Sequence, residues 1–137
     1  MNEVPQYTYP RPTMEKPGMV TALGVLTLVS GIINILTGLG LTGGLVLGTL
    51  GLGLLCAPVT VLPAILGVFE VLYAIKLLAN PPVPVQFSQT IAILEICCIL
   101  FGNVIALVVG ILALVFYSDA QVRSYFEAIN APTTPAA

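Results

Sequence analysis

Three ionisable side chains, Glu70, Lys76 and Glu95, lie within apolar stretches of the chain. A charged group at the centre of a membrane helix costs roughly 2.5 to 3.5 kcal/mol on insertion scales, so such residues are the first candidates for a proton or ion site. Lys76 and Glu95 lie at similar distances from the loop between their predicted spans, and we expect a salt bridge between them. Glu70 is predicted either to bind a proton or cation or to join helices through a hydrogen bond.

The sequence offers little else for catalysis. It has no histidine, which removes the commonest general base and metal ligand. The glycine-rich residues 43–53 lie within an apolar stretch rather than after a strand, so they are a very weak match to a phosphate-binding loop. The three cysteines, Cys56, Cys97 and Cys98, are an odd count with two adjacent members, which is a poor disulfide framework. We expect them to be small buried apolar residues, with palmitoylation or metal contact as the alternative, and we expect no enzyme, no cofactor and no metal.

Small and hydrogen-bonding side chains recur at helical spacing within the apolar stretches. Such residues let helices approach closely and bond to one another inside lipid. The positions are Thr27, Ser30, Asn34 and Thr37; Gly24, Gly31 and Gly38; Gly44 and Gly48; and Gly102, Ala106 and Gly110. We interpret them as helix-packing surfaces, with a pore lining as the alternative.

The composition indicates the solvent in which these elements fold. Only 7% of the residues are charged, against about a quarter in a soluble domain. So few charged residues cannot cover the surface of a water-soluble fold. The apolar surface that remains is tolerated by lipid. The absence of a basic cluster also excludes nucleic acid as a partner. The expected partners are the lipid bilayer and other membrane subunits or further copies of the chain.

Prolines divide the apolar part into four predicted spans. A single helix through residues 41–80 would be nearly twice as long as the ~30 Å hydrocarbon layer at ~1.5 Å per residue, so we place a break at Pro58, reinforced by Pro63. Prolines in residues 80–88 predict a loop. The expected domains are a disordered arm over residues 1–18, spans over about 19–38, 43–57, 60–79 and 89–117, and a disordered tail over 131–137. The last span exceeds what a bilayer requires, so tilt or extension beyond the surface is expected.

Residues 118–130 have the pattern of a short amphipathic helix. Their apolar side chains recur at a spacing of three and four, opposite the charged ones. The apolar face is Val122, Tyr125, Phe126 and Ile129. We expect this helix to lie along the membrane surface, with a frayed tail as the alternative. The fold class is therefore an all-α integral membrane four-helix bundle with a short amphipathic C-terminal helix.

The few basic residues predict the orientation. Four spans place Arg11, Lys16 and Arg123 on one side against Lys76 alone, so both termini are expected in the cytoplasm. A three-span arrangement gathers Lys76 with Arg11 and Lys16 instead. Charge does not separate the two arrangements, and helix length favours four spans.

The second half of the chain, from Pro63 to Phe126, resembles a group of small, uncharacterised four-span bacterial membrane proteins. The resemblance lies in Ile65-Leu66-Gly67-Val68-Phe69-Glu70 with Tyr73, in Gly102-Asn103-Val104-Ile105, and in Phe116-Tyr117-Ser118-Asp119 with Val122-Arg123 and Tyr125-Phe126. The family often ends its last span with Asn-Asp-Pro-Glu-Val-Lys-x-Tyr-Phe, and here Ala120 and Gln121 replace its Pro and Glu. The resemblance implies four spans, cytoplasmic ends and a bacterial plasma membrane, and it implies no activity.

Two functional hypotheses follow from these features. The first is a non-enzymatic accessory or scaffold subunit that acts through helix packing. The alternative is a small proton- or cation-coupled oligomeric transporter, with Glu70 as the titrating site and the pair of Glu95 and Lys76 as a gate.

Overall fold

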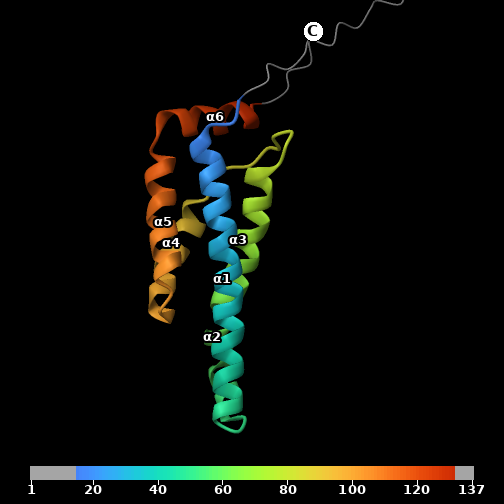
Figure 1. Ribbon diagram of the computed structural model, residues 1–137, viewed down its shortest axis with the longest axis vertical. Helices are drawn as coiled ribbons and strands as arrows, with labels where there is room; N and C mark the ends of the chain where they lie inside the picture. The colour runs from blue at the N-terminus through green and yellow to red at the C-terminus, as the bar shows by residue number, and fades with distance from the viewer. Residues whose placement is uncertain (1–14, 132–137) are drawn as a thin grey trace, which may run out of the picture.

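The chain folds into two helical hairpins and a helix that lies across their shared end (Figure 1). The computed structural model describes residues 15–131, so most of the predicted arm and tail lies outside it. The elements are α1 Gly18–Gly48, η1 Leu52–Cys56, α2 Ala57–Thr60, α3 Leu62–Leu78, α4 Gln89–Cys97, η2 Cys98–Phe101, α5 Val104–Tyr117 and α6 Ala120–Asn130. Every regular element of the described part is a helix, which confirms the all-α class.

The first hairpin turns at Leu50 and Gly51, later than the sequence suggested. α1 runs unbroken past residue 38 to Gly48, so the predicted span 19–38 and the start of the predicted span 43–57 are one helix. The helix closes where Leu50 and Gly51 adopt φ angles of 52° and 95°. The Gly51 amide then donates to the Val46 carbonyl at 2.7 Å, and the Leu50 amide donates to the Leu47 carbonyl at 3.3 Å. This pattern of two bonds closes helices at a left-handed residue.

The expected break at Pro58 is wrong. Pro58 and Pro63 each lie in the first turn of a helix, α2 and α3 respectively. A first-turn position has no intrahelical acceptor for its amide, so the missing N–H of proline costs little there. The segment from Leu52 to Leu78 therefore continues as one apolar rod of 27 residues.

The predicted span 89–117 is instead a second hairpin, folded back at Gly102 and Asn103. Gly102 adopts a φ of 79°. The Gly102 amide donates to the Ile99 carbonyl at 2.9 Å and the Asn103 amide donates to the Cys98 carbonyl at 3.2 Å, and these two bonds end the preceding helix. Asn103 then caps α5, since its side chain accepts from the Ala106 amide at 3.1 Å. With 14 residues, α5 is about 21 Å long, shorter than a ~30 Å hydrocarbon layer.

Four spans are therefore not found. The described residues contain two helices that are long and apolar enough to cross a membrane, α1 and the rod Leu52–Leu78. A third crossing arises only if α5 and α6, which meet at a bend of 78°, are counted as one broken span. Two or three helices of the described part are thus candidates for crossing a membrane, which is consistent with a membrane protein.

The main core lies where α6 crosses the end of the bundle. Asp119 starts α6 by accepting from the amides of Gln121 and Val122 at 2.8 and 3.2 Å. The apolar face predicted for this helix packs onto the ends of the other helices. The core residues are Val20, Leu23, Tyr73, Leu77, Ala92, Ala113, Tyr117, Val122, Tyr125 and Phe126. α6 therefore buries its apolar face against protein.

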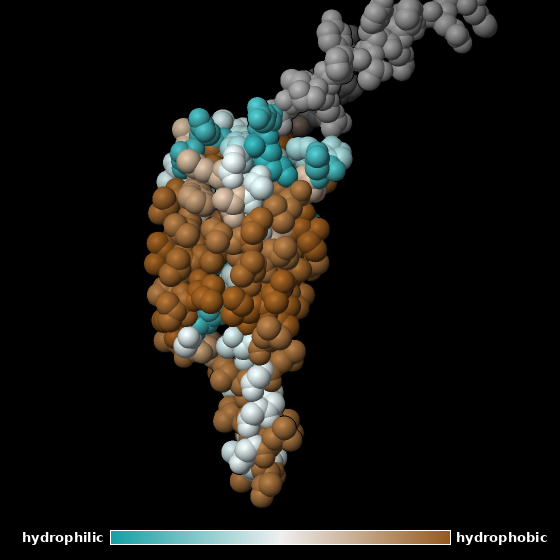
Figure 2. Space-filling model, in the orientation of Figure 1, coloured by the Kyte–Doolittle hydropathy of each residue, from teal (hydrophilic) through white to brown (hydrophobic). Residues whose placement is uncertain are grey.

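On the face that Figure 2 shows, polar surface gathers mainly at this same end, and most of the surface below it is apolar apart from one small polar patch near the lower end of the wider part of the molecule. The Lys16 ammonium donates to the carbonyls of Leu77 and Ala79 at 2.8 and 2.9 Å. Lys76, in the last turn of α3, therefore lies at the same end as Lys16. Its expected placement on the opposite side is wrong, because α1 and the segment Leu52–Leu78 run antiparallel and bring the end of α3 back to the start of α1.

Candidate functional site

Five polar side chains from α1, α3, α4 and the start of α5 meet inside the bundle, away from the polar end. They are Ser30, Asn34, Glu70, Glu95 and Asn103. Ser30, Asn34 and Glu70 have no exposed surface, and Glu95 and Asn103 are 1% and 6% exposed. These residues are called the polar cluster below.

A chain of amide hydrogen bonds orders one side of the polar cluster. The Asn34 amide nitrogen donates to both carboxyl oxygens of Glu70, at 2.9 and 3.0 Å. Asn103 in turn donates to the Asn34 carbonyl oxygen at 2.7 Å. Because Asn103 also caps α5, the turn of the second hairpin fixes the orientation of Asn34 and, through it, that of Glu70.

The other side of the polar cluster lacks such partners. The Ser30 side chain lies beside both Glu70 and Glu95, and the two carboxyl groups are close enough to interact electrostatically. Yet Ser30 Oγ and Glu95 Oε1 are buried and have no hydrogen-bond partner within the described residues. Buried polar atoms are almost always paired, so this exception marks a place where chemistry could occur.

Glycines bring the helices close enough to form the polar cluster. A Cβ on Gly31 of α1 would lie 2.8 Å from the Gly67 carbonyl and 3.0 Å from the Glu70 Cβ. A Cβ on Gly110 of α5 would lie 3.0 Å from the Glu95 Cβ. Only glycine permits these approaches, so these glycines deliver both carboxyl groups to the centre.

The predicted salt bridge between Lys76 and Glu95 is wrong. Lys76 is exposed at the end of α3, whereas Glu95 points inward and forms no ion pair with it in the described structure. The prediction assumed that α4 is the direct antiparallel partner of α3. In the structure α4 pairs with α5 across the Gly102 turn, and this pairing turns Glu95 toward α1 and Glu70.

The structure places the predicted packing residues in several different settings. Gly24, Gly31 and Gly38 lie against α3, and Ala106 and Gly110 are buried in the second hairpin. Ser30 and Asn34 belong to the polar cluster, and Gly102 forms the turn. Gly44 and Gly48 remain open, since a Cβ there would meet no atom within 4 Å.

Sequence reasoning missed Asn103 as a member of the site. Its signal was available, because a glycine followed by an asparagine is a common sequence for ending one helix and capping the next. The apolar residues on both sides concealed it by suggesting a single long span.

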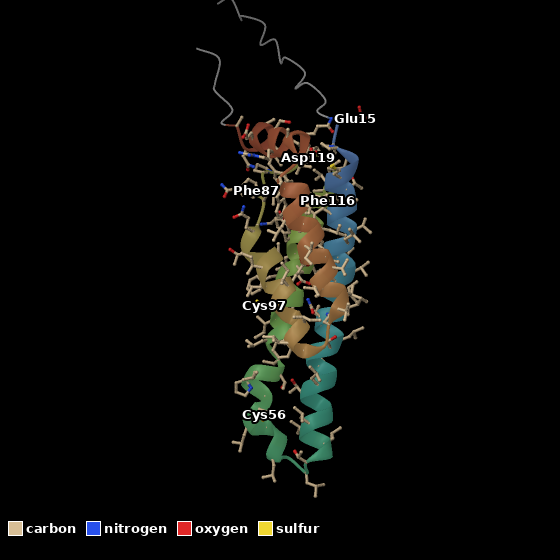
Figure 3. All side chains as sticks on the ribbon, turned by 90° about the vertical axis from the view of Figure 1, so that its left-hand side faces the viewer. Glu15, Cys56, Phe87, Cys97, Phe116 and Asp119 are labelled. Atoms are coloured by element: carbon tan, nitrogen blue, oxygen red, sulfur yellow. The ribbon has the colours of Figure 1, made fainter. Side chains whose placement is uncertain are left out.

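The cysteines contribute nothing to the polar cluster as ligands. All three are free; Cys56 and Cys97 are exposed, contrary to the expectation of burial, and only Cys98 is buried. Cys56 lies on the protruding end of the first hairpin, far from Cys97 (Figure 3). Within the described residues no three histidine, cysteine or acidic side chains gather to hold a metal ion.

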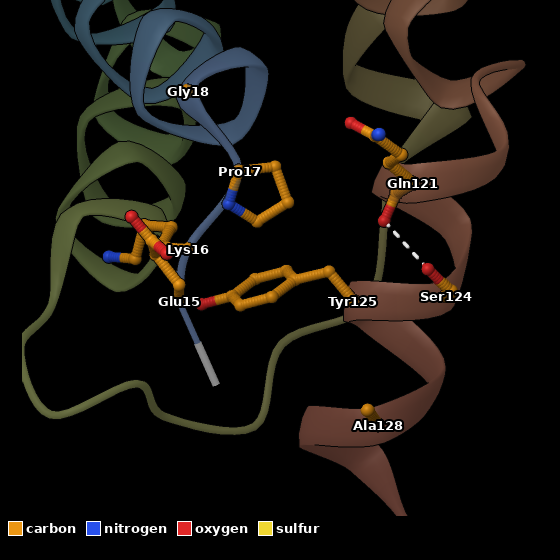
Figure 4. A pocket seen from close by; sticks show the side chains of 8 residues that line it. All are labelled: Glu15, Lys16, Pro17, Gly18, Gln121, Ser124, Tyr125 and Ala128. Carbon is orange, nitrogen blue, oxygen red and sulfur yellow. Dashed lines mark hydrogen bonds between the residues drawn. The ribbon is translucent and has the colours of Figure 1, made fainter. Parts of the chain in front are cut away.

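Two surface hollows lie elsewhere. One of about 570 Å³ separates the start of α1 from α6, with Tyr125 reaching from α6 toward Glu15 and Lys16 (Figure 4). Burial raises the pKa of Tyr125 above its ordinary value. The other, of about 310 Å³, is an apolar groove between α3 and the segment α4–η2. Neither hollow includes a residue of the polar cluster.

Comparison with known proteins adds no assignment. No family model, no curated protein and no solved structure matches the chain. The resemblance to small four-span bacterial proteins therefore stays a prediction.

Proposed function

We propose that this protein is a non-enzymatic membrane subunit that acts by association, binding another apolar membrane helix along the free end of its first hairpin. The observation that carries the proposal is a glycine face on α1 that no part of the described chain covers. The partner is a helix of another membrane subunit or of a second copy.

The free end exists because the second hairpin is short. The hairpin of α4 and α5 lies beside only the part of α1 and α3 nearest α6, and the remainder of the first hairpin projects beyond it (Figure 1). Side chains on this projection are among the most exposed apolar groups of the described residues: Leu47 is 80%, Leu50 97% and Leu55 85% exposed.

The glycine face lies on this projection. Gly40, Gly44 and Gly48 follow one another at a spacing of four on α1, and a Cβ on any of them would meet no atom within 4 Å. Glycines at this spacing let two membrane helices approach until their backbones touch. The glycines nearer the start of α1 already pack against α3, so this face is the part of the α1 glycine pattern left for a partner.

The orientation belongs to the same proposal. All three described basic residues, Lys16, Lys76 and Arg123, lie at the α6 end, which we place in the cytoplasm together with both termini. α1 and the rod Leu52–Leu78 cross the bilayer, and α4 and α5 enter and leave it from the cytoplasmic side. α6 lies at the interface. A bacterial plasma membrane is the location that the family resemblance implies.

The test compares two neighbouring glycines that differ only in the face they occupy. The protein is extracted in mild detergent, and the mass and composition of its particle are measured for wild type, for Gly44→Leu and for the control Gly43→Leu. A Cβ on Gly43 would also meet no atom within 4 Å, but Gly43 lies off the face of Gly40, Gly44 and Gly48. We expect a defined complex for wild type and the control, and its loss for Gly44→Leu. A monomeric wild-type particle, or equal complexes in both variants, would contradict the proposal.

Cross-linking, together with the composition of the particle, identifies the partner. Cys56 is exposed on the projection, so a thiol-reactive cross-linker can join it to a neighbouring copy. A cross-linked homodimer indicates a second copy, and a stoichiometric foreign subunit indicates an accessory role.

A further inference from the structure

Glu70 and Glu95 come from different helices, face the same interior space and lie beside the same serine. Neither carboxyl group is matched by a base, because no basic side chain forms an ion pair with either one within residues 15–131. The hydrogen-bond partner of Glu70 is neutral Asn34. Glu70 and Glu95 are therefore the main buried ionisable groups of the described bundle that no opposite charge balances.

Two ionised carboxylates cannot coexist in this position. Burial in an apolar interior opposes each charge, and like charges at short range oppose one another. At least one positive charge must accompany the pair, as a proton on one carboxyl group or as a metal cation between them.

The two carboxyl groups are not equivalent. Asn34 donates to both oxygens of Glu70, and this interaction favours its charged form. Glu95 has a buried oxygen, Oε1, without a partner, next to the equally unpaired hydroxyl of Ser30. Of the two, Glu70 is thus the carboxyl group better supported in its charged form, and Glu95 with Ser30 provides the free oxygen atoms.

The number of free oxygens limits what can bind. Calcium takes six to eight oxygen ligands, and magnesium requires a nearly ideal octahedron that usually includes several waters. The polar cluster has far fewer free oxygens and is closed to solvent. One monovalent charge is sufficient here: a proton needs a single carboxyl oxygen, and a sodium ion would draw on the oxygens of both carboxyl groups together with Ser30 Oγ.

We propose that Glu70, Glu95 and Ser30, oriented by Asn34, form a binding site for one monovalent cation, either a proton or a sodium ion. Binding leaves the site with one net negative charge, which the Asn34 amide stabilises. The site is independent of the glycine face of Gly40, Gly44 and Gly48, so either proposal can fail without the other.

Other titratable groups face the site from the elements around it. They are Tyr73 of α3, Cys98 of η2 and Tyr117 of α5, and each lies within electrostatic range of Glu95. The two tyrosine hydroxyls are hydrogen-bonded to each other at 3.0 Å, and Tyr73 also accepts from the Ser88 amide at 3.2 Å. The carboxyl groups are therefore the groups expected to exchange the cation.

Infrared difference spectroscopy tests the proposal directly, because the C=O band of a protonated carboxyl group is separate from that of a carboxylate. The full chain is reconstituted in liposomes and perfused with choline buffer while the pH is raised, then with sodium in place of choline at fixed pH. We expect the protonated-carboxyl band to disappear as the pH rises, falling about tenfold per pH unit above its midpoint. We also expect Glu95→Gln to remove this band and Ser30→Ala to shift its midpoint. The exposed Glu127 of α6 provides the matched control, because Glu127→Gln should leave the band unchanged.

The perfusion of the wild-type protein alone tests the proposed cation site, even if a variant fails to fold. Loss of the band with both pH and sodium supports a site at which the two cations compete, and loss with pH alone supports a proton site. A band that changes with neither pH nor sodium identifies a permanently neutral structural carboxyl group and overturns the proposal. Absence of the band throughout the titration overturns it as well.

Discussion

Replacing Asn103 should measure how strongly the turn of the second hairpin is tied to the first. The side chain has two roles: it caps α5 by accepting from the Ala106 amide at 3.1 Å, and it donates to the buried Asn34 carbonyl at 2.7 Å. Asn103→Ala removes both interactions. Asn103→Ser keeps a capping hydroxyl but is too short to reach Asn34.

The expected losses follow from the two interactions. A side-chain helix cap contributes about 1 kcal/mol, and a hydrogen bond between membrane helices about 0.6 kcal/mol on average and about 1.7 at most. Asn103→Ala should therefore lower the free energy of unfolding by about 2 kcal/mol and Asn103→Ser by about 1 kcal/mol. Both effects are large beside a total stability of roughly 5 to 15 kcal/mol.

Ser88 provides the matched control for the capping role. It caps α4 by accepting from the Ile91 amide at 3.3 Å and makes no bond to the polar cluster. Ser88→Ala should therefore cost about 1 kcal/mol. Reversible unfolding in bicelles gives all three values. If Asn103→Ala costs no more than Ser88→Ala, the bond to Asn34 contributes nothing and the assignment of Asn103 to the site is refuted.

Two further predictions concern the first hairpin. Gly31→Leu should lower the free energy of unfolding by about 1 to 3 kcal/mol, because its Cβ would lie 2.8 Å from the α3 backbone. Unfolding in detergent checks this, with Gly44→Leu as the control because its side chain enters open space. Equal stabilities of the two variants would contradict the close approach of α1 and α3. Leu50→Gly should raise the free energy of unfolding by about 1 kcal/mol, since a left-handed φ of 52° strains leucine but not glycine. A variant of unchanged or lower stability in the same assay would show that Leu50 is not strained.

Local signals in the sequence were sufficient for some boundaries and misleading for others. The amphipathic pattern of residues 118–130 corresponds to α6, because capping by Asp119 and the spacing of apolar residues are properties of the helix itself. Pro58 misled, because proline disrupts the interior of a helix but not its first turn, and the sequence does not state which of these it occupies. Gly102 and Asn103 carried a usable signal that the apolar run around them outweighed.

The site shows the same division between local and long-range information. The sequence identified Glu70, Glu95, Ser30 and Asn34 as exceptional, since polar groups in apolar stretches are costly wherever they pack. It paired Glu95 with Lys76 because hairpin register was counted from the loop between them. The true pairing places α4 on α5 across the Gly102 turn, and the bond from Asn103 to Asn34, 69 positions away in the chain, ties this hairpin to α1.

The sequence by itself determined that this protein is helical and suited to lipid, because composition and hydropathy act residue by residue and need no knowledge of neighbours. Only the tertiary structure decided which helices pair, and therefore that two carboxyl groups share one interior space while one glycine face remains uncovered. The physical reason is that helix pairing depends on backbone approach. Gly31 and Gly110 permit that approach between helices, whereas Gly44, of the same residue type and also within α1, meets no helix at all.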